Sequence, residues 1–204
     1  MTEPSNVGEV LFTAEEIHAG IRRLSDDLMH TYKDNKFSVV SVLKGAAVFT
    51  ADLIRQLPRE LKLNFIVASS YHRQEMSSGS LTVEYMPPSA EFAGQRILLV
   101  DDILETGTTL SHLQNEILRR GAREVKTCVL LEKRVPWTRT IRADFRCFFV
   151  DNIFVVGYGL DLAERYRNLP FIGVPSDNNR YWWSPDFRKK MGRSKSAPFR
   201  RMEF

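Results

Sequence analysis

The sequence predicts an α/β domain in which helices flank a mainly parallel central sheet. Short runs rich in Val, Ile and Leu alternate along the chain with segments whose apolar residues recur at helical spacing. The 204 residues are enough for one domain with a substantial core. The contents of 43% hydrophobic and 26% charged residues are ordinary for a globular protein, and no apolar run reaches the ~18 residues of a membrane helix. We therefore expect no association with a membrane.

Local signals mark the individual elements. Thr13 and Glu16 have the spacing of a capping box, so a helix should begin after Thr13, where Ile17, Ile21 and Leu24 follow at helical spacing. The expected strands are 37–43, 61–68, 97–100, 125–131 and 148–156, and the further helices are 46–57 and 110–120, the latter closed by Gly121.

Two stretches depart from this alternation. Segment 69–90 is long and polar and contains Gly79 and Pro87, which predicts a mobile lid, although a weak alternation at 81–85 leaves a β-hairpin open. Residues 176–204 carry eight Lys and Arg against three acids, a surplus of +5 in a chain of net charge +4. The excess positive charge therefore belongs to this end of the chain and not to the body of the domain, which weakens the case for a protein built to bind nucleic acid. An extension at 179–204 contains Tyr181, Trp182 and Trp183 beside its basic residues, so it could bind RNA, but we favour an oligomer contact or an addition to the domain.

Cysteine usage and the first residues predict the compartment. Cys128 and Cys147 both lie in apolar runs, as buried thiols of a reducing compartment do. Residues 1–10 are polar and acidic and lack the basic start and apolar run of a secretory signal. We therefore expect a cytoplasmic protein.

The most informative motif is ILLVDDILETGTTL at 97–110. An apolar strand leads into Asp101 and Asp102, and a Thr-Gly-Thr-Thr turn at 106–109 then opens a helix. Ligands of open α/β sheets bind beyond the carboxyl ends of the strands, and the N–H groups of such a turn suit a phosphate monoester. Carboxylates would repel that phosphate but accept hydrogen bonds from hydroxyls or bind a metal, so ribose 5-phosphate fits both parts. The alternative is a strand-turn-helix whose acids only cap the helix. A GxxxxGK[ST] loop is absent from the sequence, which disfavours hydrolysis of nucleoside triphosphates.

This motif resembles the signature of the type I phosphoribosyltransferases, and 10–174 is similar to the hypoxanthine-guanine branch in order and spacing. The supporting stretches are SVLKGA at 41–46, LLEKR at 130–134 and FVVGYGLDLAERYRNLPFIGV at 154–174. The resemblance implies a domain over 1–178 with a small hood built from the chain ends, a lid, Mg2+ as cofactor, and a homodimer or homotetramer. It implies transfer of a 5-phosphoribosyl group from phosphoribosyl pyrophosphate to N9 of hypoxanthine or guanine in purine salvage.

The resemblance also implies roles for the matching residues. Glu105 would exchange a proton with N7 of the purine. The residues implied to bind the ribose and its 5′-phosphate are Asp101, Asp102, Thr106, Gly107, Thr108 and Thr109. Those implied for pyrophosphate are Lys44, Gly45, Ser70, Tyr71 and Arg167, and the peptide before Lys44 can be cis in this family. Lys133 would donate to O6 of the base, which favours a 6-oxopurine over adenine. Phe154 would stack on the base beside Val155. Asp161 would bind Mg2+, and Asp101 and Asp102 are further candidate ligands.

Two positions depart from the family pattern. Glu105 stands where 6-oxopurine enzymes usually have Asp, one methylene shorter. Trp137 stands where many relatives have an arginine near pyrophosphate, and Arg139 could replace that arginine. Xanthine, or uracil as in regulatory members, remains an alternative base. Glu105 favours purine chemistry because those regulators tend to carry a bulky aromatic there. A non-catalytic regulator that binds nucleotide or RNA is the alternative from another class.

Overall fold

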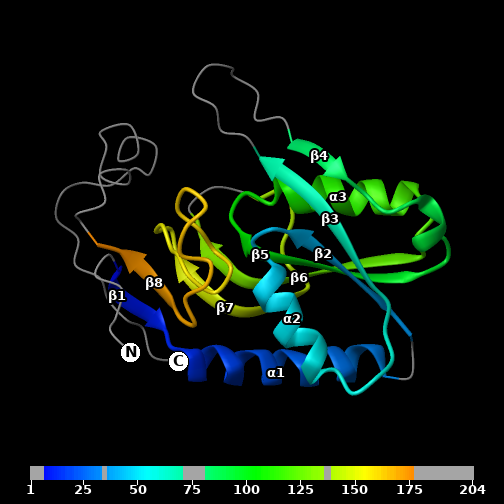
Figure 1. The fold of residues 1–204 in the computed structure, drawn as a ribbon. Helices are drawn as coiled ribbons and strands as arrows, with labels where there is room; N and C mark the ends of the chain where they lie inside the picture. Colours follow the sequence, from blue (N-terminus) through cyan, green and yellow to red (C-terminus); the bar gives the residue numbers. More distant parts are fainter. Residues whose placement is uncertain (1–6, 34–35, 71–80, 136–138, 177–204) are drawn as a thin grey trace.

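A computed structural model describes residues 7–33, 36–70, 81–135 and 139–176 (Figure 1). In chain order, the elements are β1 (Val7–Phe12), α1 (Ala14–Tyr32), β2 (Ser38–Leu43), α2 (Ala47–Gln56), β3 (Leu63–Ser70), β4 (Leu81–Tyr85), the short 3-10 helix η1 (Ser89–Glu91), β5 (Arg96–Leu104), α3 (Thr108–Arg119), β6 (Glu124–Arg134), β7 (Phe145–Asp151) and β8 (Ile172–Pro175).

The described strands form two sheets. The larger has the order β4-β3-β2-β5-β6-β7, in which only β4 runs antiparallel to its neighbour. β1 and β8, from the two ends of the chain, pair antiparallel in a separate two-stranded sheet that stands where the hood is expected. The predicted α/β class with a mainly parallel sheet is confirmed.

Helices cover both faces of the large sheet, which explains why its central strands are apolar on both sides. In β5, Leu98 and Val100 belong to the core cluster that includes α1 and α2, whereas Ile97 and Leu99 belong to the cluster that includes α3. In Figure 1, α1 and α2 accordingly lie below the sheet and α3 above it. All four side chains are buried, so β5 is the centre of the fold.

The capping box at α1 is present as predicted. The Thr13 hydroxyl accepts a hydrogen bond from the Glu16 N–H at 3.2 Å, and the Glu16 carboxylate accepts one from the Thr13 N–H at 2.9 Å. Both satisfy N–H groups that a helix start leaves without partners. Ile17, Ile21 and Leu24 then face the core.

Three sequence expectations need correction. β5 runs on to Leu104, because its pairing with β6 continues to the Leu104–Glu132 pair, so Asp101 lies inside the strand and not at its end. The strand expected at 148–156 is instead Phe145–Asp151, since the pairing with β6 begins at Phe145 and ends at Asp151. The irregular segment expected at 69–90 contains strand on both sides of its undescribed part, as in the hairpin alternative: its first two residues end β3, and β4 pairs with β3. Residues 71–80 between them lie outside the described part.

Both cysteines are unpaired and buried. In the described ranges, no helix has the length and apolar character required to cross a bilayer.

Candidate active site

The residues singled out in the sequence gather at one edge of the large sheet. β2, β5 and β6 are parallel neighbours, so their carboxyl ends lie side by side. Lys44 follows β2, Glu105 follows β5, and Lys133 lies one residue before the end of β6. This is the edge where open α/β sheets bind ligands.

Lys133 and Glu105 form an ion pair, with Nζ and Oε2 3.0 Å apart. The Lys133 side chain is only 7% exposed, whereas that of Glu105 is 42% exposed. A buried ammonium needs a partner, and Glu105 supplies it from the solvent side. The pair therefore presents a hydrogen-bond donor and a carboxylate next to each other.

Asp101 and Asp102 lie where β5 has lost its β2 neighbour, since that pairing ends at Val100. Asp101 Oδ1 accepts the N–H of Asp102 at 3.0 Å, and Asp102 Oδ1 accepts that of Ile103 at 2.8 Å. Burial raises the pKa of Asp101, and the adjacent Asp102 raises it further. Burial also raises the pKa of Asp102, although the hydrogen bonds with Asp101 and Ile103 and the charge of Arg167 oppose that rise.

The turn after β5 presents N–H groups and hydroxyls to solvent. α3 begins at Thr108 after Gly107, whose φ is 84°. The Thr106 hydroxyl accepts the Thr108 N–H at 3.3 Å and lies 3.1 Å from the Thr108 hydroxyl. Thr106 and Thr108 are exposed and Thr109 is half-buried. The amino end of α3 is thus open to an anion, as a phosphate site requires.

A second charged cluster joins the turn after β2 to the loop before β8. Lys44 Nζ lies 3.0 Å from Glu164 Oε2. Arg167 Nη2 lies 2.8 Å from Asp161 Oδ1 and 3.3 Å from Glu164 Oε1, and its Nη1 donates to the Gly159 carbonyl at 2.8 Å. The hydrogen bond from Lys44 and the nearby charge of Arg167 lower the pKa of Glu164. The peptide bond between Leu43 and Lys44 is cis.

Gly45 and Gly159 bring the second charged cluster close to Asp102. A Cβ on Gly45 would lie 1.7 Å from Asp102 Oδ2, and a Cβ on Gly159 would lie 2.1 Å from the Gly45 carbonyl oxygen. Gly159 also has a φ of 99°, which other residues rarely adopt. The turn at Gly45 is therefore packed between Asp102 and Gly159, and no larger side chain fits at either glycine without movement.

The remaining predicted residues lie at the margins of this edge. Phe154 is half-buried in the chain that follows β7, and the Val155 side chain packs in the core. Ser70 is the last residue of β3. Tyr71, Trp137 and the extension 179–204 lie outside the described residues.

Comparison with known proteins gives the family. A model of the phosphoribosyl transferase domain matches residues 10–163. The chain belongs to the phosphoribosyltransferase family. The hypoxanthine-guanine phosphoribosyltransferase of Bacillus subtilis is 41% identical over 170 residues, which cover 83% of this chain and 93% of that one. The bifunctional protein TilS/HprT of Listeria innocua is 40% identical over 170 residues, but the chain spans only 26% of its length.

Solved structures agree. The hypoxanthine phosphoribosyl transferase of Trypanosoma cruzi, studied for the role of its C-terminal region in oligomeric state and enzymatic activity, has a TM-score of 0.79 and 34% identity over 87% of this chain and 96% of that one. The same enzyme in complex with the product IMP has a TM-score of 0.76 and 33% identity, covering 88% of this chain and 100% of that one. The sequence assignment to the hypoxanthine-guanine branch of the phosphoribosyltransferases is confirmed.

Sequence reasoning missed a polar network that supports this phosphoribosyltransferase site from behind. The buried carboxylate of Glu132 is paired with both Arg139 and Arg146. Arg139 Nε also donates to the main-chain oxygen of Glu105 at 3.0 Å. The guanidinium of Arg139, expected as a substitute pyrophosphate ligand, is thus used to hold the loop that carries Glu105. A period of two along β6 could have signalled this, since it turns Glu132 to the face opposite Lys133.

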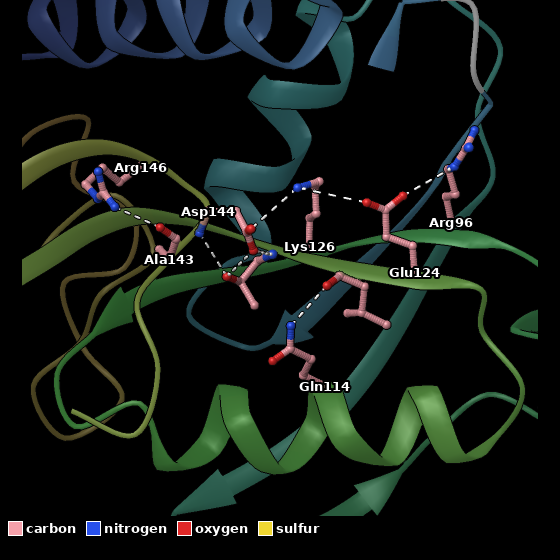
Figure 2. A network of polar contacts seen from close by, with 9 residues as sticks. Arg96, Gln114, Glu124, Lys126, Ala143, Asp144 and Arg146 are labelled. Atoms are coloured by element: carbon pink, nitrogen blue, oxygen red, sulfur yellow. Dashed lines mark hydrogen bonds and ion pairs between the residues drawn. The ribbon is translucent and has the colours of Figure 1, made fainter. Parts of the chain in front are cut away.

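Figure 2 shows the contacts of Asp144, which lies just before β7. Asp144 Oδ2 accepts the N–H of Thr127 at 2.8 Å and its hydroxyl at 3.0 Å, and Oδ1 lies 3.6 Å from Lys126 Nζ. Nearer the site, the Thr140 N–H donates to the Thr106 carbonyl at 3.1 Å. Residues 139–144 are therefore bonded to β6 through Asp144 and to the turn after β5 through Thr140.

The residues present suit a magnesium ion that arrives with a phosphate ligand. In the described part of the chain, no three His, Cys, Asp or Glu residues cluster as a complete metal site. Mg2+ commonly uses one or two carboxylates together with substrate phosphates and water, so a complete protein cage is not needed. Asp161 belongs to the second charged cluster, and its side chain is 31% exposed, so it offers a carboxylate that a magnesium ion could share with a phosphate.

Proposed function

We propose that this protein transfers the 5-phosphoribosyl group of phosphoribosyl pyrophosphate to N9 of a 6-oxopurine, giving IMP or GMP and pyrophosphate in purine salvage. The Lys133–Glu105 pair carries the proposal, because it sets a donor and a carboxylate 3.0 Å apart beside an open helix start. The IMP complex of the similar Trypanosoma cruzi enzyme supports the same product class.

The base would lie against Lys133 and Glu105. Lys133 donates to O6 of hypoxanthine or guanine, and this donor would meet the amino group of adenine unfavourably. Glu105 accepts the N7 proton as N9 forms its bond to C1 of the ribose. Phe154 stacks on the ring, and because the Val155 side chain is in the core, Val155 contacts the base through its main chain.

The ribose and its phosphate would lie along β5 and the start of α3. Asp101 and Asp102 accept hydrogen bonds from the 2′- and 3′-hydroxyls. The turn Thr106, Gly107, Thr108 and Thr109 binds the 5′-phosphate through N–H groups and hydroxyls. Binding both ends of the sugar fixes C1 opposite N9, and this positioning supplies much of the acceleration.

Pyrophosphate would leave toward the second cluster, as the C1–oxygen bond breaks and its electron pair stays with the leaving group. Lys44, Gly45 and Arg167 bind it, with Ser70 and Tyr71 from segment 69–90, which we propose as the lid. Asp161, with Asp101 and Asp102 as further candidates, holds Mg2+. The chemistry that this ion supplies is neutralisation of charge on the leaving group.

We further propose a phosphoribosyltransferase domain at 1–178, a basic extension at 179–204 and a homodimer or homotetramer. The C-terminal region of the Trypanosoma cruzi relative was studied for its role in oligomeric state, which favours an oligomer contact as the role of the extension. The free thiols of Cys128 and Cys147 support a cytoplasmic location.

A spectrophotometric screen tests the function. Purified protein with Mg2+ and phosphoribosyl pyrophosphate is offered hypoxanthine, guanine, xanthine, adenine or uracil, with Glu105→Gln as the test variant and Glu15→Gln as an exposed control. We expect turnover of hypoxanthine or guanine that falls about 100-fold or more in Glu105→Gln and is unchanged in Glu15→Gln. Silence with every base, despite binding of phosphoribosyl pyrophosphate, would mean a regulator that keeps the fold without the chemistry.

A further inference from the structure

Glu164 is the one residue of the second charged cluster without a role in the proposed reaction. Its two carboxylate oxygens face two different cations, Lys44 at 3.0 Å and Arg167 at 3.3 Å. These are the two side chains proposed above to bind pyrophosphate. Glu164 therefore bridges the cations that the leaving group must reach.

The backbone around Glu164 is arranged to hold its carboxylate there. Leu162 and Arg165 exchange two main-chain hydrogen bonds of 3.2 Å, which close a two-residue turn over Ala163 and Glu164. Both turn residues have positive φ, 52° and 63°, although neither is glycine. Non-glycine residues adopt this conformation rarely.

Asp161 stabilises this turn. Its Oδ2 accepts the Glu164 N–H at 2.9 Å, while its Oδ1 pairs with Arg167 at 2.8 Å. One carboxylate thus fixes both the backbone of Glu164 and the guanidinium that Glu164 contacts. The loop therefore sets the backbone of Glu164, and the contacts with Lys44 and Arg167 hold its carboxylate.

Burial does not explain the pairing. The side chains of Lys44 and Glu164 are each 66% exposed, so water could hydrate both ions if they were apart. Lys133, at 7% exposed, is different, because it needs Glu105 as a partner.

We propose that Glu164 is a positioning residue that competes with pyrophosphate for Lys44 and Arg167. This inference rests on the proposed function. The carboxylate holds both cations in place and is displaced by the phosphate oxygens of the ligand. Because each cation must give up Glu164 first, pyrophosphate binds less tightly and leaves faster than it would from free cations.

The test is isothermal titration calorimetry of inorganic pyrophosphate with MgCl2 in excess. Glu164→Gln keeps the size of the side chain and removes its charge. Glu164→Asn also removes the charge and is well tolerated at positive φ, so it serves if the first variant perturbs the turn. Glu15→Gln, on exposed α1, controls for the change in net charge. Thermal melts confirm that each variant is folded.

We expect both Glu164 variants to bind pyrophosphate about threefold to tenfold more tightly than the parent, with the gain shrinking at high salt, since the lost ion pairs are exposed. Glu15→Gln should bind as the parent does. In steady state, kcat for nucleotide synthesis should fall where pyrophosphate release limits turnover, while the KM for phosphoribosyl pyrophosphate also falls. If Glu164 only supported the loop, replacing it would weaken the binding of pyrophosphate.

Two negative results are distinguishable. A parent protein that binds no pyrophosphate contradicts the proposed pyrophosphate site and this inference with it. A parent that binds pyrophosphate, with Glu164 variants that bind it equally or more weakly, overturns the competition alone and leaves the proposed reaction standing.

Discussion

Asp101→Asn should make the folded protein more stable at neutral pH while weakening binding of the ribose. Asp101 is 9% exposed and sits next to the carboxylate of Asp102. Burial and that neighbour raise its pKa, so the charged form is disfavoured in the fold. An asparagine has nearly the same shape, carries no charge, and can donate its amide N–H to Asp102 as a protonated Asp101 would.

The sign follows from linkage between protonation and folding. The unfolded chain releases the proton of Asp101 near pH ~3.9, whereas the folded chain holds it to a higher pH. Stability is therefore lost as pH rises from ~4 through the folded pKa, and Asp101→Asn escapes this loss. We expect a gain of about 0.5–2 kcal/mol at pH 7.5, a range usual when a strained active-site group is removed, or about 2–6 °C in Tm.

Thermal melts of both proteins from pH 5 to 8.5 measure the difference, and calorimetry with phosphoribosyl pyrophosphate measures the binding. The gain in Tm should shrink toward acidic pH. Asp144→Asn is the matched control, because its carboxylate accepts the N–H and hydroxyl of Thr127 in Figure 2, so this variant should lose stability. The reasoning is refuted if Asp101→Asn is less stable than the parent at pH 7.5, or if its gain does not depend on pH.

Three further changes test the supports of the site. Gly45→Ala places a Cβ 1.7 Å from Asp102 Oδ2, so kcat/KM should fall about 100-fold with little change in Tm; unchanged kinetics would mean that the turn yields freely. Arg139→Gln leaves Glu132 with one partner and removes the donor to the Glu105 carbonyl. The free energy of unfolding should fall by about 3 kcal/mol, and kcat should fall with it; if neither changes, Arg139 does not support the site. Thr13→Ala removes the cap of α1 and should lower the unfolding free energy by about 1 kcal/mol with kcat unchanged; equal stability in denaturant titrations would count against the cap.

The sequence predicted the elements whose signals are local. The capping box at Thr13 and the apolar runs of β2, β5 and β6 depend on neighbouring residues, and the predicted strands and helices appear in the structure. Strand ends were less well predicted, because they depend on partners. β5 continues past Asp101 only because β6 continues to pair with it, and β7 begins at Phe145 because Cys128 lies opposite.

For the site, too, the sequence predicted what depends on the order of the elements but not what depends on contacts between distant residues. Parallel strands bring their carboxyl ends together, so Lys44, Glu105 and Lys133 could be placed at one edge from order alone. The partners of these residues could not be predicted, because they join parts of the chain far apart in sequence. Lys44 and Glu164 are separated by 120 residues, and their pairing depends on how the loop before β8 folds back over β2.

The two ion pairs at the site look alike but should respond in opposite ways to the loss of their acids. Glu105 neutralises a buried lysine and is the proposed acceptor of the N7 proton, so removing its charge should leave both Lys133 and that proton without a partner. Glu164 neutralises an exposed lysine and takes no part in bond making, so removing its charge only frees Lys44 and Arg167 for the ligand. One glutamate should therefore lower turnover by weakening the chemistry, and the other should lower it only by slowing release of a product held more tightly. A comparison of Glu105→Gln with Glu164→Gln separates the two through the affinity for pyrophosphate, which should rise in the second variant alone.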